Sequence, residues 1–314
     1  MNRRGALCTT TGCVLAGLVP ASRARTLNGF DLGGALVPPQ AIQPGGPPRD
    51  GIPAIDRPRF VDAVGSGLSD ADRVLGLEVG AVARAYPVRI LNWHEIVNDR
   101  IGGRAVAVTY CPLCGTGVAF DARVGGQDTQ FGVSGLLYNS DVLLYDRRTE
   151  SLWSQIMARA VAGPLKGTPL QALPLTHTSW SAWRGRHPHA EVLATPTGTE
   201  RDYGRDPYDG YDKVPRLMFD VEHHDARLEL KAWVLGLVVG GRPRAYPFDW
   251  LARNADAQGD WHDELGGQRI RVRYDRRARS AEAYDAAGRR LHAVSAFWFA
   301  WVAFHPATDL PKEP

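Results

Sequence analysis

Cysteine is scarce in this chain, and its positions limit the chemistry that the protein can perform. The 314 residues contain four cysteines, of which Cys8 and Cys13 lie in an N-terminal stretch typical of a removable leader. Cys111 and Cys114 are therefore the only thiols expected in the mature protein. A framework of several disulfides is excluded, and any thiol chemistry depends on this one pair.

Motifs of several enzyme classes are absent from the sequence. There is no G-x-S-x-G elbow, no glycine-rich phosphate loop, no dinucleotide fingerprint and no H-E-x-x-H. No histidine follows the C-x-x-C directly, as covalent attachment of haem requires. The sequence therefore gives no motif for nucleotide chemistry, for serine or zincin-type hydrolysis, or for bound c-type haem.

Excess charge and long apolar runs are also lacking. The formal net charge is +3, and removal of residues 1–24 takes away three arginines and no acid, which leaves 3 − 3 = 0. A near-neutral protein gives no electrostatic argument for nucleic acid as a partner. The apolar run 6–18 is too short to span a bilayer, so we expect no stable transmembrane span in the mature protein.

The N-terminus has the composition of an export signal. Arg3 and Arg4 precede the apolar run, and Val19-Pro20-Ala21 or Ser22-Arg23-Ala24 offers small residues for cleavage. We therefore predict that residues 1–24 form a signal and that the protein is exported, to the periplasm or the extracellular space. A retained leader that tethers the protein to the membrane stays open, as does the choice between the general secretory and twin-arginine routes.

An internal repeat is the main organisational feature. Residues 74–87 recur as residues 234–247 without a gap, with ten of fourteen positions identical. The similarity continues more weakly, because residues 101–110 share two glycines, a valine and the final tyrosine with residues 265–274. After the shared tyrosine the first copy has Cys111 and the second has Asp275, so only the first copy carries a thiol.

The repeat predicts a mainly β (β-rich α+β) fold, with two repeat-related antiparallel β halves and few short helices. Residues 25–59 are rich in proline and glycine and should be extended; 60–195 form the first half, 196–230 a linker, and 231–310 the second half without the site. The best helical segment is 87–97, followed by 247–255 and 179–186. The aromatic run 297–301 is predicted to be a core strand.

The candidate site is the sequence C-P-L-C-G at residues 111–115. Thiols spaced C-x-x-C either bind a metal or cycle with a disulfide, and Pro112 and Gly115 favour a metal-binding turn. His94 precedes the strand that leads to Cys111, so we expect it to be the third ligand. Two thiolates and an imidazole suit one copper or zinc ion per chain. With three protein ligands, a fourth position would be open to water or substrate.

Several alternatives stay open at this point. Glu95, Tyr138 and Asp141 are candidates for a catalytic role, although Tyr138 and Asp141 can equally tie down a turn. The same cysteines can serve a thiol–disulfide oxidoreductase or redox sensor, or a scaffold protein with a structural metal. A small molecule or a metal donor can be a partner, and the oligomeric state is undetermined.

Longer motifs surround the site. They are N-W-H-E-I-V-N-D at 92–99, T-Y-C-P-L-C-G-T at 109–116, D-G-I-P-A-I at 50–55, S-G-L-L-Y-N-S-D at 134–141 and T-E-S-L-W-S-Q at 149–155. With these motifs the chain resembles the bacterial domain of unknown function 3179 family. The resemblance covers nearly the whole mature chain and implies no particular activity.

Overall fold

The computed structural model describes residues 25–312. Of these residues 41% are in strands and 12% in helices, so the predicted mainly β fold is confirmed. The predicted signal, residues 1–24, lies outside the described residues. None of the helices in the described part of the chain combines the length and the apolar character needed to cross a membrane.

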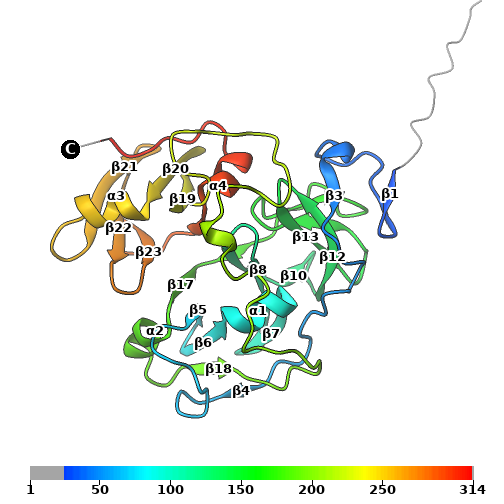
Figure 1. Ribbon diagram of the computed structural model, residues 1–314, viewed down its shortest axis with the longest axis horizontal. Coiled ribbons are helices and arrows are strands. Elements are labelled where there is room, and N and C mark those ends of the chain that lie inside the picture. Colours follow the sequence, from blue (N-terminus) through cyan, green and yellow to red (C-terminus); the bar gives the residue numbers. More distant parts are fainter. Residues whose placement is uncertain (1–24, 313–314) are drawn as a thin grey trace, which may run out of the picture.

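Five larger sheets form a propeller-like ring (Figure 1). Three of them belong mainly to residues 42–193, and every strand pair in them is antiparallel except β6 with β18. The first has the order β15(Arg159–Ala162), β14(Leu152–Ser154), β13(Asp141–Asp146), β12(Phe131–Tyr138), β3(Ile42–Pro44). The second has the order β16(Ala172–Leu173), β9(Thr116–Asp121), β8(Arg104–Cys111), β7(Ile96–Ile101). The third has the order β17(Leu175–Ser179), β5(Arg73–Val79), β6(Val82–Pro87), β18(Glu191–Leu193), β4(Phe60–Val61).

The remaining two large sheets belong to the C-terminal part of the chain. One has the order β20(Arg242–Pro247), β19(Trp233–Val239), β24(Val294–Phe297), and the other β21(Asp260–Leu265), β22(Gln268–Asp275), β23(Ser280–Asp285). Two short hairpins complete the strands: β1(Thr26–Leu27) with β2(Phe30–Asp31), and β10(Arg123–Val124) with β11(Gln127–Asp128). The helices are α1(Val88–His94), α2(Trp180–Arg186), α3(Phe248–Asn254) and α4(Trp298–Phe304), with 3₁₀ turns at Pro39–Ala41 and Tyr211–Lys213.

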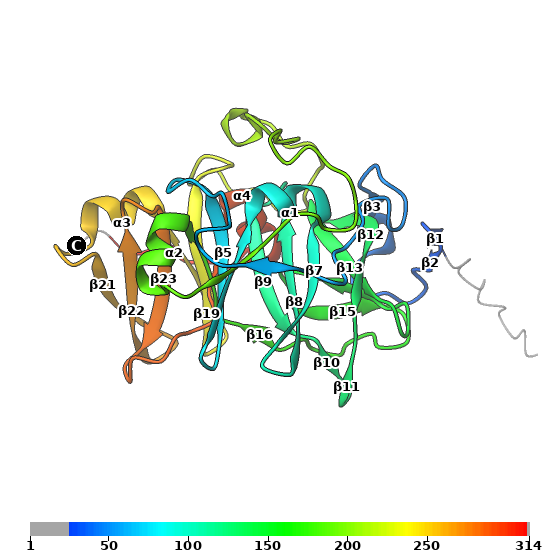
Figure 2. The same cartoon turned by 90° about the horizontal axis from the view of Figure 1, so that it is seen from below.

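The sequence repeat corresponds to a repeated unit of structure. The order β5, β6, α1, β7, β8, β9 recurs as β19, β20, α3, β21, β22, β23. Both copies also repeat a buried polar contact: the Tyr86 hydroxyl donates to Asp99 at 2.6 Å, and the Tyr246 hydroxyl donates to Asp263 at 2.7 Å. The four helices lie towards the same end of the ring (Figure 2).

A second repeat relates β17 and α2 to β24 and α4, and the pattern W-x-A-W-x-x-x-H-P at 180–188 recurs at 298–306. Helix α2 follows β17 and packs on β5, and helix α4 follows β24 and packs on β19, so the two pairs are equivalent. In each copy a tryptophan covers a strand glycine. A Cβ at Gly76 would lie 2.3 Å from the Trp183 ring, and a Cβ at Gly236 would lie 2.2 Å from the Trp301 ring.

The predicted strand at 297–301 is wrong beyond its first residue. Phe297 ends β24, and α4 begins at Trp298. Trp298 and Trp301 are one helical turn apart, so both rings can be buried from a helix on the β19 side. The helix predicted over 87–97 is also shorter, because α1 ends at His94 and Ile96 begins β7.

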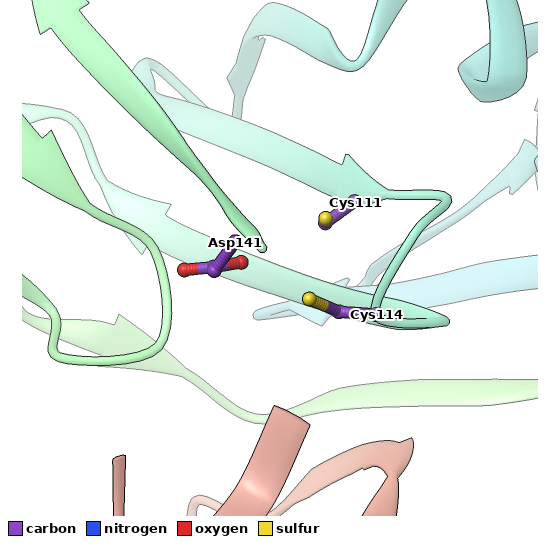
Figure 3. Close-up of side chains that lie close together, drawn as sticks. All are labelled: Cys111, Cys114 and Asp141. Carbon is purple, nitrogen blue, oxygen red and sulfur yellow. The ribbon is translucent and has the colours of Figure 1, made fainter. Parts of the chain in front are cut away.

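The segment predicted as a linker, residues 196–230, passes over the same end of the ring as the helices (Figure 2). Its contacts are specific: Tyr203 bonds His94, Asp206 accepts a hydrogen bond from Asn92, and Phe219 accepts one from Ser140. Beneath it, the turn of the β8–β9 hairpin faces the turn of the β12–β13 hairpin (Figure 3).

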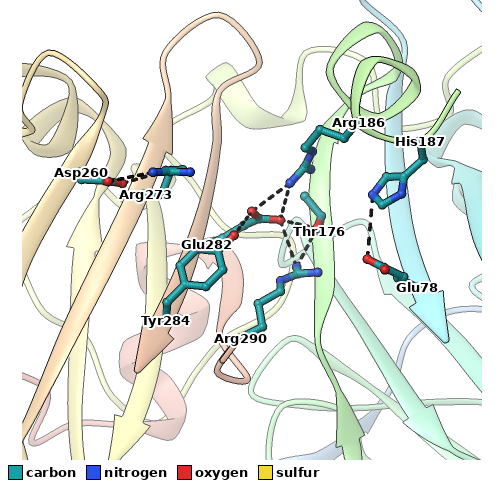
Figure 4. Close-up of polar contacts among 9 residues, drawn as sticks. All are labelled: Glu78, Thr176, Arg186, His187, Asp260, Arg273, Glu282, Tyr284 and Arg290. Atoms are coloured by element: carbon teal, nitrogen blue, oxygen red, sulfur yellow. Dashed lines mark hydrogen bonds and ion pairs between the residues drawn. The ribbon is translucent and has the colours of Figure 1, made fainter. Parts of the chain in front are cut away.

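A buried acid joins the two repeat-related parts. Glu282 of β23 is 7% exposed and forms ion pairs with Arg186 at 2.9 Å and Arg290 at 3.2 Å (Figure 4). It also accepts hydrogen bonds from Thr176 and Tyr284. Burial by itself raises the pKa of Glu282, but the two arginines and these hydrogen bonds outweigh it and lower the pKa to about 2.

We predict that alanine at Gly76 or Gly236 destabilises the protein by roughly 1–3 kcal/mol or more, because the added methyl overlaps a buried indole. The two losses should be similar, since the environments are equivalent. Gly185 in α2 is the matched control, because a Cβ there would meet no atom within 4 Å and alanine favours a helix. Chemical denaturation measures all three variants; a neutral Gly76→Ala would contradict the packing.

We predict that Glu282 makes stability depend on pH in the acid range. Its pKa is lower in the folded state than its ordinary value of 4.5, so its contribution is complete above about pH 4.5 and disappears as the pH falls towards about 2. The contribution at pH 7 is on the order of 3 kcal/mol. Glu282→Gln should lose it at pH 7 and differ little from wild type near pH 2. Exposed Glu264→Gln should match wild type throughout.

Candidate metal centre

The first two ligand candidates lie on a tight turn. Cys111 ends β8 opposite Thr116 of β9, and residues 112–115 close the hairpin. Gly115 has φ +64°, which a residue with a side chain adopts only with strain. A Cβ there would also lie 2.8 Å from the Trp233 ring. Glycine at this position therefore allows the turn to form against the second half of the chain.

Three other hairpins contain a turn of the same length, at residues 146–151, 154–159 and 275–280. In the first and the last, an aspartate opens the turn and its carboxylate accepts the backbone N–H three residues later, from Thr149 at 2.7 Å and from Ala278 at 2.9 Å. Cys111 occupies the aspartate position in the turn at residues 111–116. Burial raises the pKa of the Cys111 thiol, while the Cys114 side chain and backbone N–H lower it as hydrogen-bond donors. The sulfur therefore stands where two of the other turns place a carboxylate.

The structure adds Asp141 to the two cysteines. Asn139 and Ser140, with φ +52° and +62°, form the two-residue turn between β12 and β13 and place Asp141 beside the sulfurs (Figure 3). One donor atom from each of Cys111, Cys114 and Asp141 lies within 4.8 Å of the others. Among residues 25–312 no other His, Cys, Asp or Glu side chains form such a group.

The turn that carries Asp141 is held in place from two directions. The Ser140 hydroxyl donates to the Phe219 carbonyl at 2.6 Å, and the Asn139 side chain accepts the Glu222 N–H at 2.8 Å and donates to the Ala303 carbonyl at 3.2 Å. The Ser140 carbonyl in turn accepts from both thiols, at 3.6 Å from Cys111 and 3.4 Å from Cys114. This carbonyl oxygen therefore joins the two sulfurs and the Asp141 carboxylate as a fourth candidate ligand atom.

Asp141 is buried with part of its hydrogen-bonding capacity unused. Its Oδ2 accepts the Ile156 N–H at 3.1 Å, and its Oδ1 has no partner among the described residues. Asp141, Cys111 and Cys114 are each 0% exposed. Burial raises the pKa of Asp141 to about 7 and also raises the pKa of both thiols. A bound cation would compensate the three negative charges that burial otherwise opposes.

The donor set fits a small thiophilic cation. Two thiolates and one carboxylate are ordinary zinc ligands, at about 2.3 Å for sulfur and about 2.0–2.2 Å for oxygen. Ligands at these lengths in a tetrahedron lie about 3.5–3.8 Å apart. The donor atoms here lie within 4.8 Å of one another, so binding needs only a small contraction of the group. The unpartnered Oδ1 of Asp141 is the oxygen that such an ion would satisfy.

The structure does not bring His94 to the cysteines. The Nδ1 of its ring bonds the Pro53 carbonyl at 2.7 Å, and its Nε2 bonds the Tyr203 hydroxyl at 2.7 Å. Both ring nitrogens are thus engaged, and His94 is 1% exposed. Burial lowers the pKa of His94, which favours the neutral ring. In this arrangement His94 secures the segment 196–230 to α1.

The remaining candidates differ in their distance from the centre. Tyr138 turns away and donates to Glu222 at 2.6 Å. Glu95 is buried at φ +57°, between α1 and β7. Burial and the nearby charge of Asp141 raise the pKa of Glu95 to about 8. Glu95 is therefore an acid close to the centre, outside the group of three donors, and Tyr138 has a structural contact.

The sequence pattern indicates Asp141 as a metal ligand, but less strongly than it indicates His94. Asp141 stands at the end of the motif at 134–141, as a polar residue in an apolar strand context. That pattern indicates a buried polar group, but not which partner it meets. The turn with Cys114 and the turn with Ser140 become neighbours only in the folded protein, so the sequence pattern alone does not pair them.

The fold and the site define a mainly β protein with a buried thiol–carboxylate centre. The chain belongs to the family described as "Protein of unknown function (DUF3179)", which matches residues 49–289, and this confirms the resemblance. The match includes both cysteines, Asp141 and most of both repeat copies. A search of curated proteins and a search of solved structures each found no match.

We predict that His94→Phe lowers stability without removing a metal. The change leaves the Pro53 carbonyl without its side-chain partner and removes one of the hydrogen bonds of the Tyr203 hydroxyl, which also bonds Thr197, and this costs roughly 1–3 kcal/mol. Elemental analysis of the purified variant should give the metal content of wild type, and urea denaturation should give the loss. Tyr203→Phe removes the hydroxyl that bonds His94 and Thr197 and leaves the imidazole in place, so it should also keep the metal content of wild type. Loss of metal at unchanged stability would identify His94 as a ligand instead.

Proposed function

We propose that the protein binds one zinc ion through Cys111, Cys114 and Asp141. The observation that carries the proposal is the buried, unpartnered Oδ1 of Asp141 in a group whose donor atoms lie within 4.8 Å. Without a cation, three acidic groups share an interior site, where the Asp141 carboxylate accepts the Ile156 N–H and its Oδ1 has no hydrogen-bond partner among the described residues. Such an arrangement is costly unless a positive charge compensates it.

The donor chemistry favours zinc over copper. Copper(I) prefers thiolates and thioethers, and copper(II) electron-transfer sites use two imidazoles with one thiolate. A carboxylate completes neither set, whereas zinc accepts sulfur and oxygen ligands together. The Ser140 carbonyl supplies a fourth oxygen near both sulfurs, and a water molecule is the other candidate for that position.

The placement of the centre favours a structural role for the ion. The proposed ligands come from the β8–β9 turn and the β12–β13 turn, so one ion would join two sheets of the ring. Closed sites of this kind stabilise folds, because the binding free energy adds to the folding free energy.

Thiol–disulfide exchange has less support. An exchanging thiol has to be reachable and has to ionise easily. Cys111 and Cys114 are fully buried, and burial raises the pKa of both. Export of the protein stays a prediction that rests on the composition of residues 1–24.

We predict about one zinc ion per chain in the mature protein purified without added metal. Cys111→Ser and Cys114→Ser should lower the zinc affinity roughly 100-fold or more, above the cost of losing a group that only orients a ligand. Asp141→Asn keeps an oxygen but loses the charge, and should lower the affinity at least about tenfold. Competition with a zinc chelator measures each value.

Tyr138→Phe is the matched control, because it alters the same β12–β13 hairpin through the contact to Glu222. It should keep full zinc content. Removal of zinc from wild type should lower the melting temperature, and should have little effect on the cysteine variants. Stoichiometric copper in place of zinc would overturn the choice of metal, and a metal-free protein with a reversible Cys111–Cys114 disulfide would overturn the centre.

A further inference from the structure

A cavity of about 390 Å³ lies between the two repeat-related parts of the chain. We call it the inter-half cavity. Residues of β5, β8 and β17 line it from one side, and residues of β19, α3 and β24 from the other, and residues from the segment 206–213 complete the lining. Its volume is in the range of sites for small organic molecules.

The inter-half cavity adjoins the turn that carries the cysteines. Pro112 of that turn lines the cavity, and so do Tyr211 and Phe297, which share a core cluster with Cys111 and Cys114. Tyr110, whose side chain alternates with that of Cys111 along β8, lines it as well. A ligand in the cavity would therefore lie next to the cysteine turn and contact other side chains than the sulfurs.

Arg73 brings an uncompensated positive charge to the cavity. Its guanidinium donates only to the backbone carbonyls of Ala278 and Arg279, and no carboxylate of the described residues lies within ion-pair distance. Burial lowers the pKa of Arg73 to about 10, and the nearby Arg279 also lowers it. A partly buried guanidinium without an acid partner is an energetic cost that a bound anion would relieve.

His177 lies beside Arg73, and one nitrogen of its ring is free to form a hydrogen bond with a ligand. It is 6% exposed, its Nδ1 is buried without a hydrogen-bond partner among the described residues, and it lines the cavity. Its ring contacts Tyr110 and Trp233 at centroid distances of 6.0 and 5.3 Å. Burial and Arg73 lower the pKa of His177 well below its ordinary value, so the ring is neutral and can donate one N–H.

A second arginine reaches the cavity from the other half. Arg279 lies in the turn 275–280, lines the cavity and has no ion pair within the part of the chain that the structure describes. Three exposed acids, Asp206, Asp209 and Asp212, also line the cavity, and the Asp206 carboxylate already accepts a hydrogen bond from Asn92. Arg73 is part-buried and His177 is buried, so the solvent screens these two groups less than it screens the acids.

The walls are largely aromatic. Trp233, Phe248, Phe297 and Tyr110 line the cavity, and Trp233 contacts the Phe297 ring at 4.7 Å between centroids. Aromatic walls with a few convergent polar groups are typical of sites that take an apolar ligand body in a fixed orientation. The charged end and the aromatic walls together specify one class of ligand.

We propose that the inter-half cavity binds a small organic carboxylate with an apolar or aromatic body. The carboxylate lies against Arg73, His177 and Arg279, and the body packs on Trp233 and Phe297. This places one guanidinium from each repeat copy on the same ligand. The site shares the Cys111–Cys114 turn with the proposed metal centre, through Pro112, but uses other side chains to hold its ligand.

The test is isothermal titration of the metal-loaded mature protein with benzoate, phenylacetate and hexanoate. Each is paired with its neutral amide, and benzylammonium is the probe of opposite charge. At least one carboxylate should saturate the protein and bind about tenfold or more tightly than its amide, because charge-assisted hydrogen bonds are the stronger kind. Benzylammonium should not compete.

Arg279→Gln should weaken binding of the carboxylate about tenfold, and Arg277→Gln, in the same turn but outside the lining, should leave it unchanged. His177→Phe should also weaken it while keeping the aromatic contacts. Melting temperature and metal content confirm that each variant is folded. Saturation by none of the three carboxylates, equal affinity for acid and amide, or preference for benzylammonium would overturn the proposal.

Discussion

The structure depends on two hairpin turns that meet in the interior and bring Cys111, Cys114 and Asp141 to one point. Polar groups at such a place need partners, and here the Asp141 carboxylate accepts the Ile156 N–H while its Oδ1 has no hydrogen-bond partner among the described residues. The surrounding contacts, from Phe219, Glu222 and Ala303, hold the second turn rigidly against the first. A cation is the partner that would turn this costly arrangement into a stabilising one.

The repeat explains how such a site can arise within a β framework. The turn at 275–280 and the turn at 111–116 have the same length and equivalent positions, but Asp275 satisfies its own turn with its carboxylate. Substitution of sulfur at the first and fourth positions keeps the turn and directs two soft ligands into the core. The backbone therefore tolerates both versions, and only the side chains determine whether a metal fits.

The same repeat explains why the inter-half cavity is asymmetric. The offset of 160 residues makes Arg73 equivalent to Trp233, and Val88 equivalent to Phe248, and all four line the cavity. In one copy the strand begins with a cation, and in the other with an indole. The two repeat copies thus place equivalent backbone positions around the cavity. Because the side chains at these positions differ, one copy supplies the charged end and the other supplies the aromatic wall.

The sequence alone determined the local features, because periodicity, turn residues and spacing act between near neighbours. It predicted the mainly β class, the repeat at 74–87 and 234–247, the helix at 179–186 and the tight turn at 111–115. It failed at 298–301, where the burial of Trp301 against Gly236 requires a helix and outweighs aromatic strand propensity. Tertiary structure decided that Asp141, rather than His94, joins the thiols. That outcome depends on long-range packing, since one turn places Asp141 beside the sulfurs while Pro53 and Tyr203 engage both nitrogens of His94.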